Sequence, residues 1–487
     1  MNALTTKIAC LWKLSKGGIL VLISTFLMVS CIDDNNEDET VLYDDTAITA
    51  FSLTGARLFH HTTSSTGGDS VYYTSAGSAV TSIAFHIDQV NRRIFNTDSL
   101  PLNTDLSKML CSVSTRNNGL PFIKPLEPGD YVYVSTTDSI DFTESREVRV
   151  YSSDGKSYVT YMVDVSKHKE DGGAFNYESW KVCDAFKQAA AIRLVALGDA
   201  VLAFVRTATA TEVYQSPAVS TDDWTKFTAS LSVSAAENVT VSNDSLFVLD
   251  GTTLLLSLNG KDYQTVSATG QPSALLGSSS RELYGMSADG QLMVSADKGK
   301  TWGTDHVAYE DAADKERVER LLPKRDIAIV TLPQGYSAKT DYVVMVGNRD
   351  VTAEAFANDS VARTWRKIVD YSNGTPEGQW VCTNEYEEVV WPLPAREHLQ
   401  LFTYDGRVLA FGGKGIGHSA AEAYDTFYES RDGGITWKPS TLVPVFGEQR
   451  SEQTMRAVTV DSHSYIWMVC GGTGEVFKGR LTRLGWK

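Results

Sequence analysis

The sequence contains little cysteine or histidine, and neither residue is arranged as a metal site or a disulfide framework. Four of the six cysteines (Cys111, Cys183, Cys382 and Cys470) lie far apart in the body of the chain, and no CxxC pair occurs. The eight histidines are scattered without ligand spacing. These patterns argue against a zinc site and a small disulfide scaffold, and we expect no metal and no other cofactor. The pairing state of the four cysteines stays open.

The chain also lacks an excess of positive charge. It has 487 residues, with 44 Lys and Arg against 60 Asp and Glu, a formal net charge of −16. A protein that binds nucleic acid or an anionic membrane surface usually carries a basic patch, so we expect neither partner. The length exceeds what one hydrophobic core normally supports, which predicts two or more domains.

Long apolar runs are missing except near the N-terminus. Residues 19–29 form an apolar run of 11 residues after three lysines, too short to span a bilayer but typical of a secretory signal. Ser30 and Cys31 follow, and a small residue before cysteine at this place resembles the bacterial lipobox. The resemblance implies cleavage after Ser30 and a membrane lipid anchor on Cys31. An ordinary signal peptide with an incidental cysteine is the alternative.

An acidic stretch, IDDNNEDE, begins directly after Cys31. An acidic tether at 31–40 resembles the surface-export signal of Bacteroidota lipoproteins, whereas a plain solvated linker explains the same charges. We therefore expect a signal peptide at 1–30, the tether at 31–40, and an outer-membrane lipoprotein of the cell envelope that is exposed at the surface. Whether it faces the periplasm or the exterior is not decided by this pattern.

Residues 41–171 have the pattern of a β-domain. The stretch 148–165 has two alternating runs around Ser-Asp-Gly, which indicates a hairpin. The stretch 82–110 adds further short strands separated by turns, without a long helical period. This spacing predicts a small Ig-like β-sandwich over 41–171.

From residue 174 to the end the chain repeats. Six units read as strand, turn, strand, loop and strand, and aromatic residues mark the ends of the first five, at Trp224, Tyr263, Trp302, Trp365 and Trp437. Repeats of this kind predict a β-propeller of about six blades over 174–487, so the fold class is all-β. Five or seven blades remain open, because residues 174–190 could add a strand or a partial blade. A short helix ended by proline is expected within 311–323.

Two eight-residue stretches share the pattern Ser-x-Asp-x-Gly-x-Thr-Trp and resemble Asp-box (BNR) repeats. Their shared residues are Ser295, Asp297, Gly299, Thr301 and Trp302, and Ser430, Asp432, Gly434, Thr436 and Trp437. Degenerate copies are marked by Asp222 and Trp224, by Asn259, Gly260 and Tyr263, and by Trp365. Aspartate accepts hydrogen bonds from the amides that follow it, glycine adopts a positive φ, and tryptophan packs over the turn. We interpret these residues as structural and not catalytic.

The Asp box also occurs in sialidases, whose chemistry needs an arginine cluster, an aspartate and a Tyr–Glu pair. Their first blade opens with Arg-Ile-Pro, but here only Ile192, Arg193 and Leu194 stand at the corresponding place. No catalytic residue can be named on this basis. A second resemblance, to a kelch repeat, rests on Arg396 and the glycine pair at 412–413, and it adds no chemistry.

The mature chain as a whole resembles a group of Bacteroidota lipoproteins that pair an Ig-like sandwich with an Asp-box propeller. The resemblance is carried by the stretches 94–105, 139–165 and 474–486, and it implies no activity. We therefore expect a surface lipoprotein whose propeller binds a glycan or a protein without catalysis. The alternatives are a structural or docking component of an envelope complex and a sialidase-like glycoside hydrolase with unidentified catalytic residues.

Overall fold

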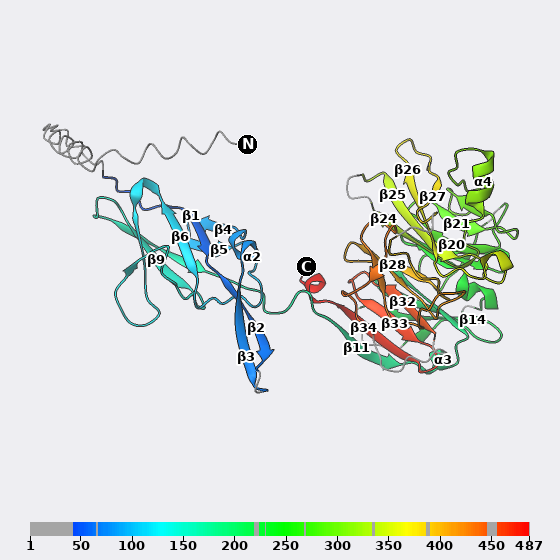
Figure 1. The fold of residues 1–487 in the computed structure, drawn as a ribbon, viewed down its shortest axis with the longest axis horizontal. Coiled ribbons are helices and arrows are strands. Elements are labelled where there is room, and N and C mark those ends of the chain that lie inside the picture. Colours follow the sequence, from blue (N-terminus) through cyan, green and yellow to red (C-terminus); the bar gives the residue numbers. More distant parts are fainter. Residues whose placement is uncertain are drawn as a thin grey trace, which may run out of the picture. The chain divides into compact units, whose positions relative to one another are not determined.

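The computed structural model describes residues 42–486, apart from 65–66, 219–223, 229, 267–268, 334–336, 386–389 and 446–454 (Figure 1). Strands dominate this part of the chain, and its helices are short. None of those helices has the length and apolar character needed to cross a membrane. Contacts divide the chain into two units, Met1–Lys169 and Glu170–Lys487, each with its own packing. The predicted all-β class is confirmed.

The first unit has two sheets around one core. Its aliphatic and aromatic core residues, among them Phe51, Ile94, Val148 and Tyr161, lie between a two-stranded and a six-stranded sheet. The smaller sheet pairs β1 (Ile48–Thr54) with β6 (Leu110–Thr115). The larger runs in the order β4 (Phe85–Asp88), β5 (Arg93–Asn96), β10 (Tyr158–Asp164), β9 (Arg146–Tyr151), β7 (Leu120–Ile123) and β8 (Val132–Tyr133). Strands β9 and β10 form the hairpin expected within 148–165. Strands β2 (Arg57–Thr63) and β3 (Asp69–Ser75) form a separate hairpin.

The described part of the second unit contains six four-stranded sheets. The first three are β12 (Ala191–Leu197), β13 (Ala200–Arg206), β14 (Thr211–Pro217) and β15 (Thr225–Lys226); β16 (Val239–Ser242), β17 (Ser245–Asp250), β18 (Thr253–Ser257) and β19 (Gln264–Thr265); and β20 (Ala274–Ser278), β21 (Leu283–Met286), β22 (Leu292–Ser295) and β23 (Gly303–Thr304). The next two are β24 (Arg325–Pro333), β25 (Thr340–Asn348), β26 (Arg363–Asp370) and β27 (Trp380–Cys382); and β28 (Gln400–Tyr404), β29 (Arg407–Phe411), β30 (Tyr428–Ser430) and β31 (Lys438–Pro439).

The last sheet joins the two ends of this unit. It runs in the order β11 (Phe175–Val182), β34 (Glu475–Leu481), β33 (Ile466–Cys470) and β32 (Arg456–Val460). The segment before β12, whose role the sequence left open, therefore supplies one strand to the last sheet. Pairing the first strand of the unit with its last strands ties the two ends of the unit together in one sheet.

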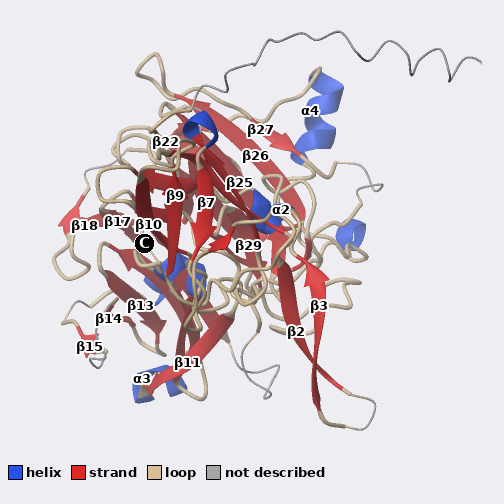
Figure 2. Ribbon diagram, turned by 90° about the vertical axis from the view of Figure 1, so that its left-hand side faces the viewer, coloured by secondary structure: helices blue, strands red, loops and turns tan. Residues whose placement is uncertain are grey.

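The sheets are arranged radially. One strand of each sheet contacts one strand of the next, in the order β12, β16, β20, β24, β28 and β32, and β32 contacts β12, so we call these six the inner strands. Figure 2 shows how strands dominate the described chain and how short its helices are. Apolar side chains fill the spaces between neighbouring sheets, as Phe204 and Val248 do between the first and second. This arrangement is a β-propeller. The expected short helix is α4 (Ala312–Glu319), and the Asp311 carboxylate caps it by accepting the amides of Ala313 and Asp314.

Candidate functional site

The first complete Asp box forms the turn between β22 and β23. The Ser295 hydroxyl donates to Asp297 at 2.8 Å and accepts the Gly299 amide at 2.9 Å. Asp297 also accepts the amide and hydroxyl of Thr301 at 2.9 and 2.7 Å, and Trp302 Nε1 donates to the Gly299 carbonyl at 3.1 Å. Although burial opposes it, hydrogen bonding from Thr301 and Ser295 holds the pKa of Asp297 below its usual value. All the polar groups of the motif are thus used inside the turn.

The second complete box has the same hydrogen-bond pattern between β30 and β31. Ser430 donates to Asp432 at 2.8 Å, Gly434 donates to Ser430 at 2.7 Å, and Asp432 accepts the amide and hydroxyl of Thr436 at 2.9 and 2.6 Å. Trp437 Nε1 donates to the Gly434 carbonyl at 3.1 Å. The Trp437 residue is only 1% exposed and packs between the fourth and fifth sheets.

The degenerate box around Asn259 makes a shorter version of this turn between β18 and β19. The Asn259 side-chain oxygen accepts the two amides that follow Gly260, both at 2.9 Å. The Tyr263 hydroxyl donates to the Gly260 carbonyl at 2.9 Å, which replaces the tryptophan bond of the complete boxes.

Of the degenerate copy marked by Asp222 and Trp224, the structure describes only the tryptophan. Trp224 packs edge-on against Phe186. Asp222, like Cys31 and the tether, lies outside the described residues.

The fourth repeat of the propeller, which forms the sheet of β24 to β27, departs from the predicted pattern. Trp365 lies within β26, the third strand of its sheet, and not in the turn that follows it. Its use as a box aromatic is therefore wrong. It is fully buried among core residues of the third and fourth sheets. Aromatic spacing alone was misleading because a buried strand and a box turn both favour tryptophan.

Four arginines of the propeller each contact a different partner and do not form the cluster that sialidase chemistry needs. Arg206 pairs with Glu237, Arg349 with Asp359 and Arg396 with Asp425, while Arg281 lies over the Tyr371 ring. The four cysteines of the body are free thiols. Burial raises the pKa of Cys111 to about 12 and the pKa values of Cys382 and Cys470 to about 11, so these thiols are poor nucleophiles.

A pocket opens where the first strands of several sheets begin. Its volume is about 310 Å³, and its lining includes Arg193, Glu237, Asp326, His398 and Arg456. An adjoining pocket of about 340 Å³ shares His398 with it and extends to Tyr424 and the loop after β29. We call these two spaces together the central pocket. Its position at the ends of five of the six inner strands makes it a candidate binding site.

Arg193 carries an unpaired charge into the central pocket. Its neighbour in β12, Leu194, packs into the core shared with the last sheet, whereas Arg193 lines the pocket. No Asp or Glu of the described chain forms an ion pair with Arg193, and burial lowers the pKa of its guanidinium. A partly desolvated cation without a counterion favours binding of an anionic group.

Three residues around the central pocket have an unusual backbone. Asp326, His398 and Tyr424 adopt positive φ values of 50°, 51° and 52°. The His398 amide donates to the Asp326 carboxylate at 2.8 Å, and the Tyr424 amide donates to the Gly412 carbonyl at 3.0 Å, which holds these conformations. A side chain with positive φ costs ~1–3 kcal/mol, and such residues gather at ligand sites.

Two of the three carboxylates that line the central pocket, Glu237 and Asp326, are already engaged, and the third is Glu397. Glu237 pairs with Arg206 at 2.7 Å, and Asp326 accepts the Asn348 amide at 3.1 Å as well as the His398 backbone. In the described ranges, no three His, Cys, Asp or Glu side chains are placed to hold a metal ion.

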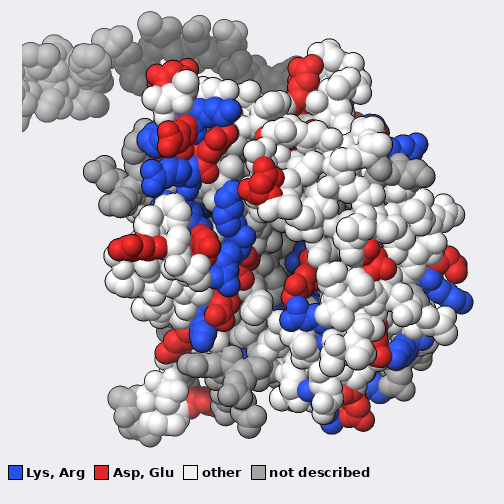
Figure 3. Space-filling model, turned by 90° about the vertical axis from the view of Figure 1, so that its right-hand side faces the viewer, with Lys and Arg blue, Asp and Glu red and all other residues white. Residues whose placement is uncertain are grey.

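Figure 3 shows Lys and Arg side chains in a row beside a hollow on one face of the second unit, with acidic side chains on both sides of the row.

Sequence reasoning did not identify Arg193, Asp326 and His398 as site residues. An arginine inside an aliphatic strand was the available signal, since Arg193 stands between Ile192 and Leu194. The sequence around Asp326 and His398 contains no pattern that marks them as site residues. They are 72 positions apart, and only the folding of the strands into a ring brings them into contact.

Two family descriptions match the chain. Residues 176–487 match the DUF6242 beta propeller domain, and residues 51–165 match the DUF6242 N-terminal domain, a domain of unknown function. The chain belongs to the DUF6242 family. The family boundaries place the propeller of this DUF6242 chain over the second unit.

Solved structures similar to this DUF6242 chain are distant. An auxiliary nutrient binding protein from Bacteroides thetaiotaomicron is 9% identical, with a TM-score of 0.38, over 76% of this chain and 93% of that one. The Trichoderma reesei family AA12 protein is 9% identical, with a TM-score of 0.36, over 64% and 96%. YCF48 from Cyanidioschyzon merolae is 12% identical, with a TM-score of 0.30, over 62% and 98%. No curated protein matches the chain. Similarities at this level carry no information about function.

Proposed function

We propose that this protein is a lipid-anchored component of the cell envelope whose propeller binds an acidic glycan in the central pocket without catalysis. The observation that carries the proposal is the unpaired Arg193 at the centre of the ring of strands. A guanidinium binds a carboxylate through two parallel hydrogen bonds, which suits the acid group of a sugar. The part of the central pocket that Arg193 lines has a volume of about 310 Å³, at the lower end for small-ligand sites, which fits one or two sugar rings.

The engaged carboxylates support binding without catalysis. A glycoside hydrolase needs two carboxyl groups free to act on the bond between two sugars. In the central pocket, Glu237 is held by Arg206 and Asp326 is held by Asn348 and His398. Glu397 is then the one remaining carboxyl group of the lining, and a single free carboxyl group does not make the pair that hydrolysis needs.

The remaining parts of the proposal concern the cellular location of the protein and its domain architecture. We assign Cys31 as the lipidated residue, the segment 31–40 as an acidic tether, and the outer face of the outer membrane as the location. The six sheets and their cyclic contacts support a propeller of six blades. The shared core of two sheets supports an Ig-like sandwich as the spacer next to the membrane.

Binding of defined oligosaccharides tests the glycan proposal. Calorimetric titration of residues 32–487 with a galacturonate oligosaccharide should give saturable binding, whereas a neutral galactose oligosaccharide of equal length should bind at least tenfold more weakly. Arg193→Gln should remove this preference. Arg116→Gln is the matched control, because it removes one positive charge from an exposed site in the first unit. Equal affinity of the Arg193→Gln variant and the unchanged protein would refute the proposal.

A second candidate function rests on the first unit. One face of its six-stranded sheet exposes large apolar side chains, with Leu120 at 48%, Tyr133 at 52% and Tyr158 at 55% exposure. The Arg149 guanidinium lies between two tyrosine rings, 3.9 Å from the ring centre of Tyr131 and 4.2 Å from that of Tyr158. Tyrosine and arginine dominate the energetic centres of protein interfaces, so this face favours a docking role in an envelope complex.

Paired substitution tests the docking role. The double variant Tyr133→Ser and Tyr158→Ser removes two exposed rings without touching the core. Envelope proteins that copurify with the unchanged chain should be lost with this variant. Equal recovery with both chains would exclude this face as the docking surface.

A further inference from the structure

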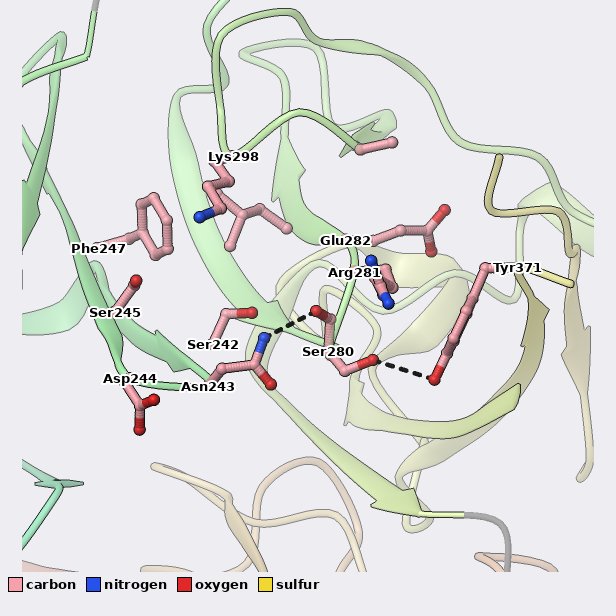
Figure 4. A pocket seen from close by; sticks show the side chains of 12 residues that line it. Ser242, Asn243, Asp244, Ser245, Phe247, Ser280, Arg281, Glu282, Lys298 and Tyr371 are labelled. Carbon is pink, nitrogen blue, oxygen red and sulfur yellow. Dashed lines mark hydrogen bonds between the residues drawn. The ribbon is translucent and has the colours of Figure 1, made fainter. Parts of the chain in front are cut away.

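A second pocket lies at the other end of the inner strands. Its volume is about 550 Å³, and it is lined by the turns that follow β16 and β20, by the first complete box, and by Tyr371. Glu237 of the central pocket precedes β16, whereas Asn243 of this pocket follows it, so the two spaces lie at opposite ends of one strand. We call this second space the hairpin pocket (Figure 4).

The walls of the hairpin pocket are held by hydrogen bonds. Asn243, at φ 51°, donates its side-chain amide to the Ser280 carbonyl at 3.0 Å, which ties the second sheet to the third. Lys298, at φ 61°, stands within the box turn that Ser295 and Asp297 close. Both backbones are in the left-handed region, where a residue with a side chain is strained, so the surrounding turns must fix them.

Two cations face this pocket without acidic partners. The Arg281 guanidinium lies 4.9 Å from the Tyr371 ring centre, and neither Arg281 nor Lys298 forms an ion pair with any described residue. In Figure 4 their charged ends lie on opposite sides of the pocket, with Ser242 and Asn243 between them. The pocket therefore offers two separated positive charges with hydrogen-bonding groups in the middle.

The acidic side chains of the pocket lining do not form ion pairs with these cations. Glu282 turns to the buried Lys367, with its oxygen 3.0 Å from Lys367 Nζ, and accepts the Tyr284 hydroxyl at 2.7 Å. Lys367 is shared with Asp305, whose oxygen lies 2.9 Å from Nζ. Asp244 is exposed at the edge of the pocket. The lining therefore holds two cations and two carboxylates, and Arg281 and Lys298 are left without a direct acidic contact.

We propose that the hairpin pocket binds a sugar ring that carries sulfate or phosphate ester groups. The Ser242 hydroxyl and the Asn243 side-chain amide donate to the Ser279 and Ser280 carbonyls, so their oxygens remain to accept from sugar hydroxyls. The Tyr371 ring supports the Arg281 guanidinium, and ester oxygens match the two cations. The volume of about 550 Å³ accommodates such a ring with its substituents. This site is separate from the central pocket and does not depend on its proposed ligand.

Titration calorimetry at low ionic strength tests this proposal on residues 32–487 with four probes. Glucose 6-sulfate and glucose 6-phosphate distinguish the two esters, glucose is the neutral control, and inorganic sulfate is the control for simple ion binding. At least one ester should bind at least tenfold more tightly than glucose and than inorganic sulfate, and the affinity should fall as salt is added.

Charge-matched variants decide whether the binding is at this pocket. Arg281→Gln and Lys298→Gln should each weaken ester binding at least threefold, whereas Lys300→Gln, which removes a lysine from the same box turn but outside the pocket, should leave it unchanged. Arg193→Gln should also leave it unchanged, which separates this test from that of the central pocket. Ester binding no tighter than glucose or sulfate, or equal losses in the Lys298 and Lys300 variants, would overturn the proposal.

Discussion

Truncation of Trp437 is the sharpest test of how the box turns support the propeller. The residue is 1% exposed and packs against Val344, Leu393 and Val408 between the fourth and fifth sheets. Burial of an aromatic side chain removes ~150–250 Å² from water. At ~25 cal/mol per Å² this area gives ~4–6 kcal/mol as an upper estimate. Measured losses for such truncations are ~3–5 kcal/mol, so we expect Trp437→Ala to cost about that much.

Trp302 provides the matched control within the same molecule. It makes the same Nε1 bond to a glycine carbonyl, at 3.1 Å in both boxes, but its ring is only partly buried. Trp302→Ala should therefore cost roughly half as much, ~1.5–2.5 kcal/mol. Trp437→Phe keeps most of the apolar area and loses the Nε1 bond, for which we expect ~1–2 kcal/mol.

Differential scanning calorimetry of the propeller transition measures these effects. With ~2 °C per kcal/mol for a large domain, Trp437→Ala should lower the transition by ~6–10 °C, and Trp302→Ala by about half of that. Equal shifts for the two alanine variants would refute the reasoning. The loss would then come from the shared hydrogen bond of the turn and not from burial between sheets.

Two further predictions concern charged side chains, Asp432 in a turn and Lys367 in the core. Hydrogen bonds hold the pKa of Asp432 below its usual value despite burial, so its ionised form stabilises the fold above the pKa of the unfolded chain, ~3.9. Because an amide at position 432 keeps one accepting oxygen, the stability difference between the unchanged protein and Asp432→Asn should be modest in denaturant titrations. It should be largest near pH 7 and narrow as pH falls below 4; a difference that widens in acid would contradict this. Lys367→Met leaves Glu282 and Asp305 buried without their cation, and we expect a loss of ~3–5 kcal/mol in the same titrations. A variant as stable as the unchanged protein would show that Lys367 does not neutralise these carboxylates.

The sequence was most informative about structural features that depend on residues close together in the chain. The Asp-box pattern indicates a turn because the hydrogen bonds made by its own side chains join residues at most four positions apart, as the bonds of Ser430, Asp432 and Thr436 show. Alternating runs likewise predicted the β9–β10 hairpin, whose register depends on adjacent residues. Trp365 was misplaced because one aromatic residue without its box partners does not distinguish a turn from a buried strand.

Tertiary structure decided what depends on residues far apart in the chain. The pairing of β11 with β34 joins segments about 300 positions apart, and no local pattern specifies that closure. The central pocket exists because the ring of sheets brings Arg193, Asp326 and His398 to one end of the inner strands. Local hydrogen bonding and hydrophobic periodicity therefore fixed the all-β class and the turns from sequence alone. The ring closure, and with it the unpaired charges of both pockets, arises from packing between sheets, which only the folded chain determines.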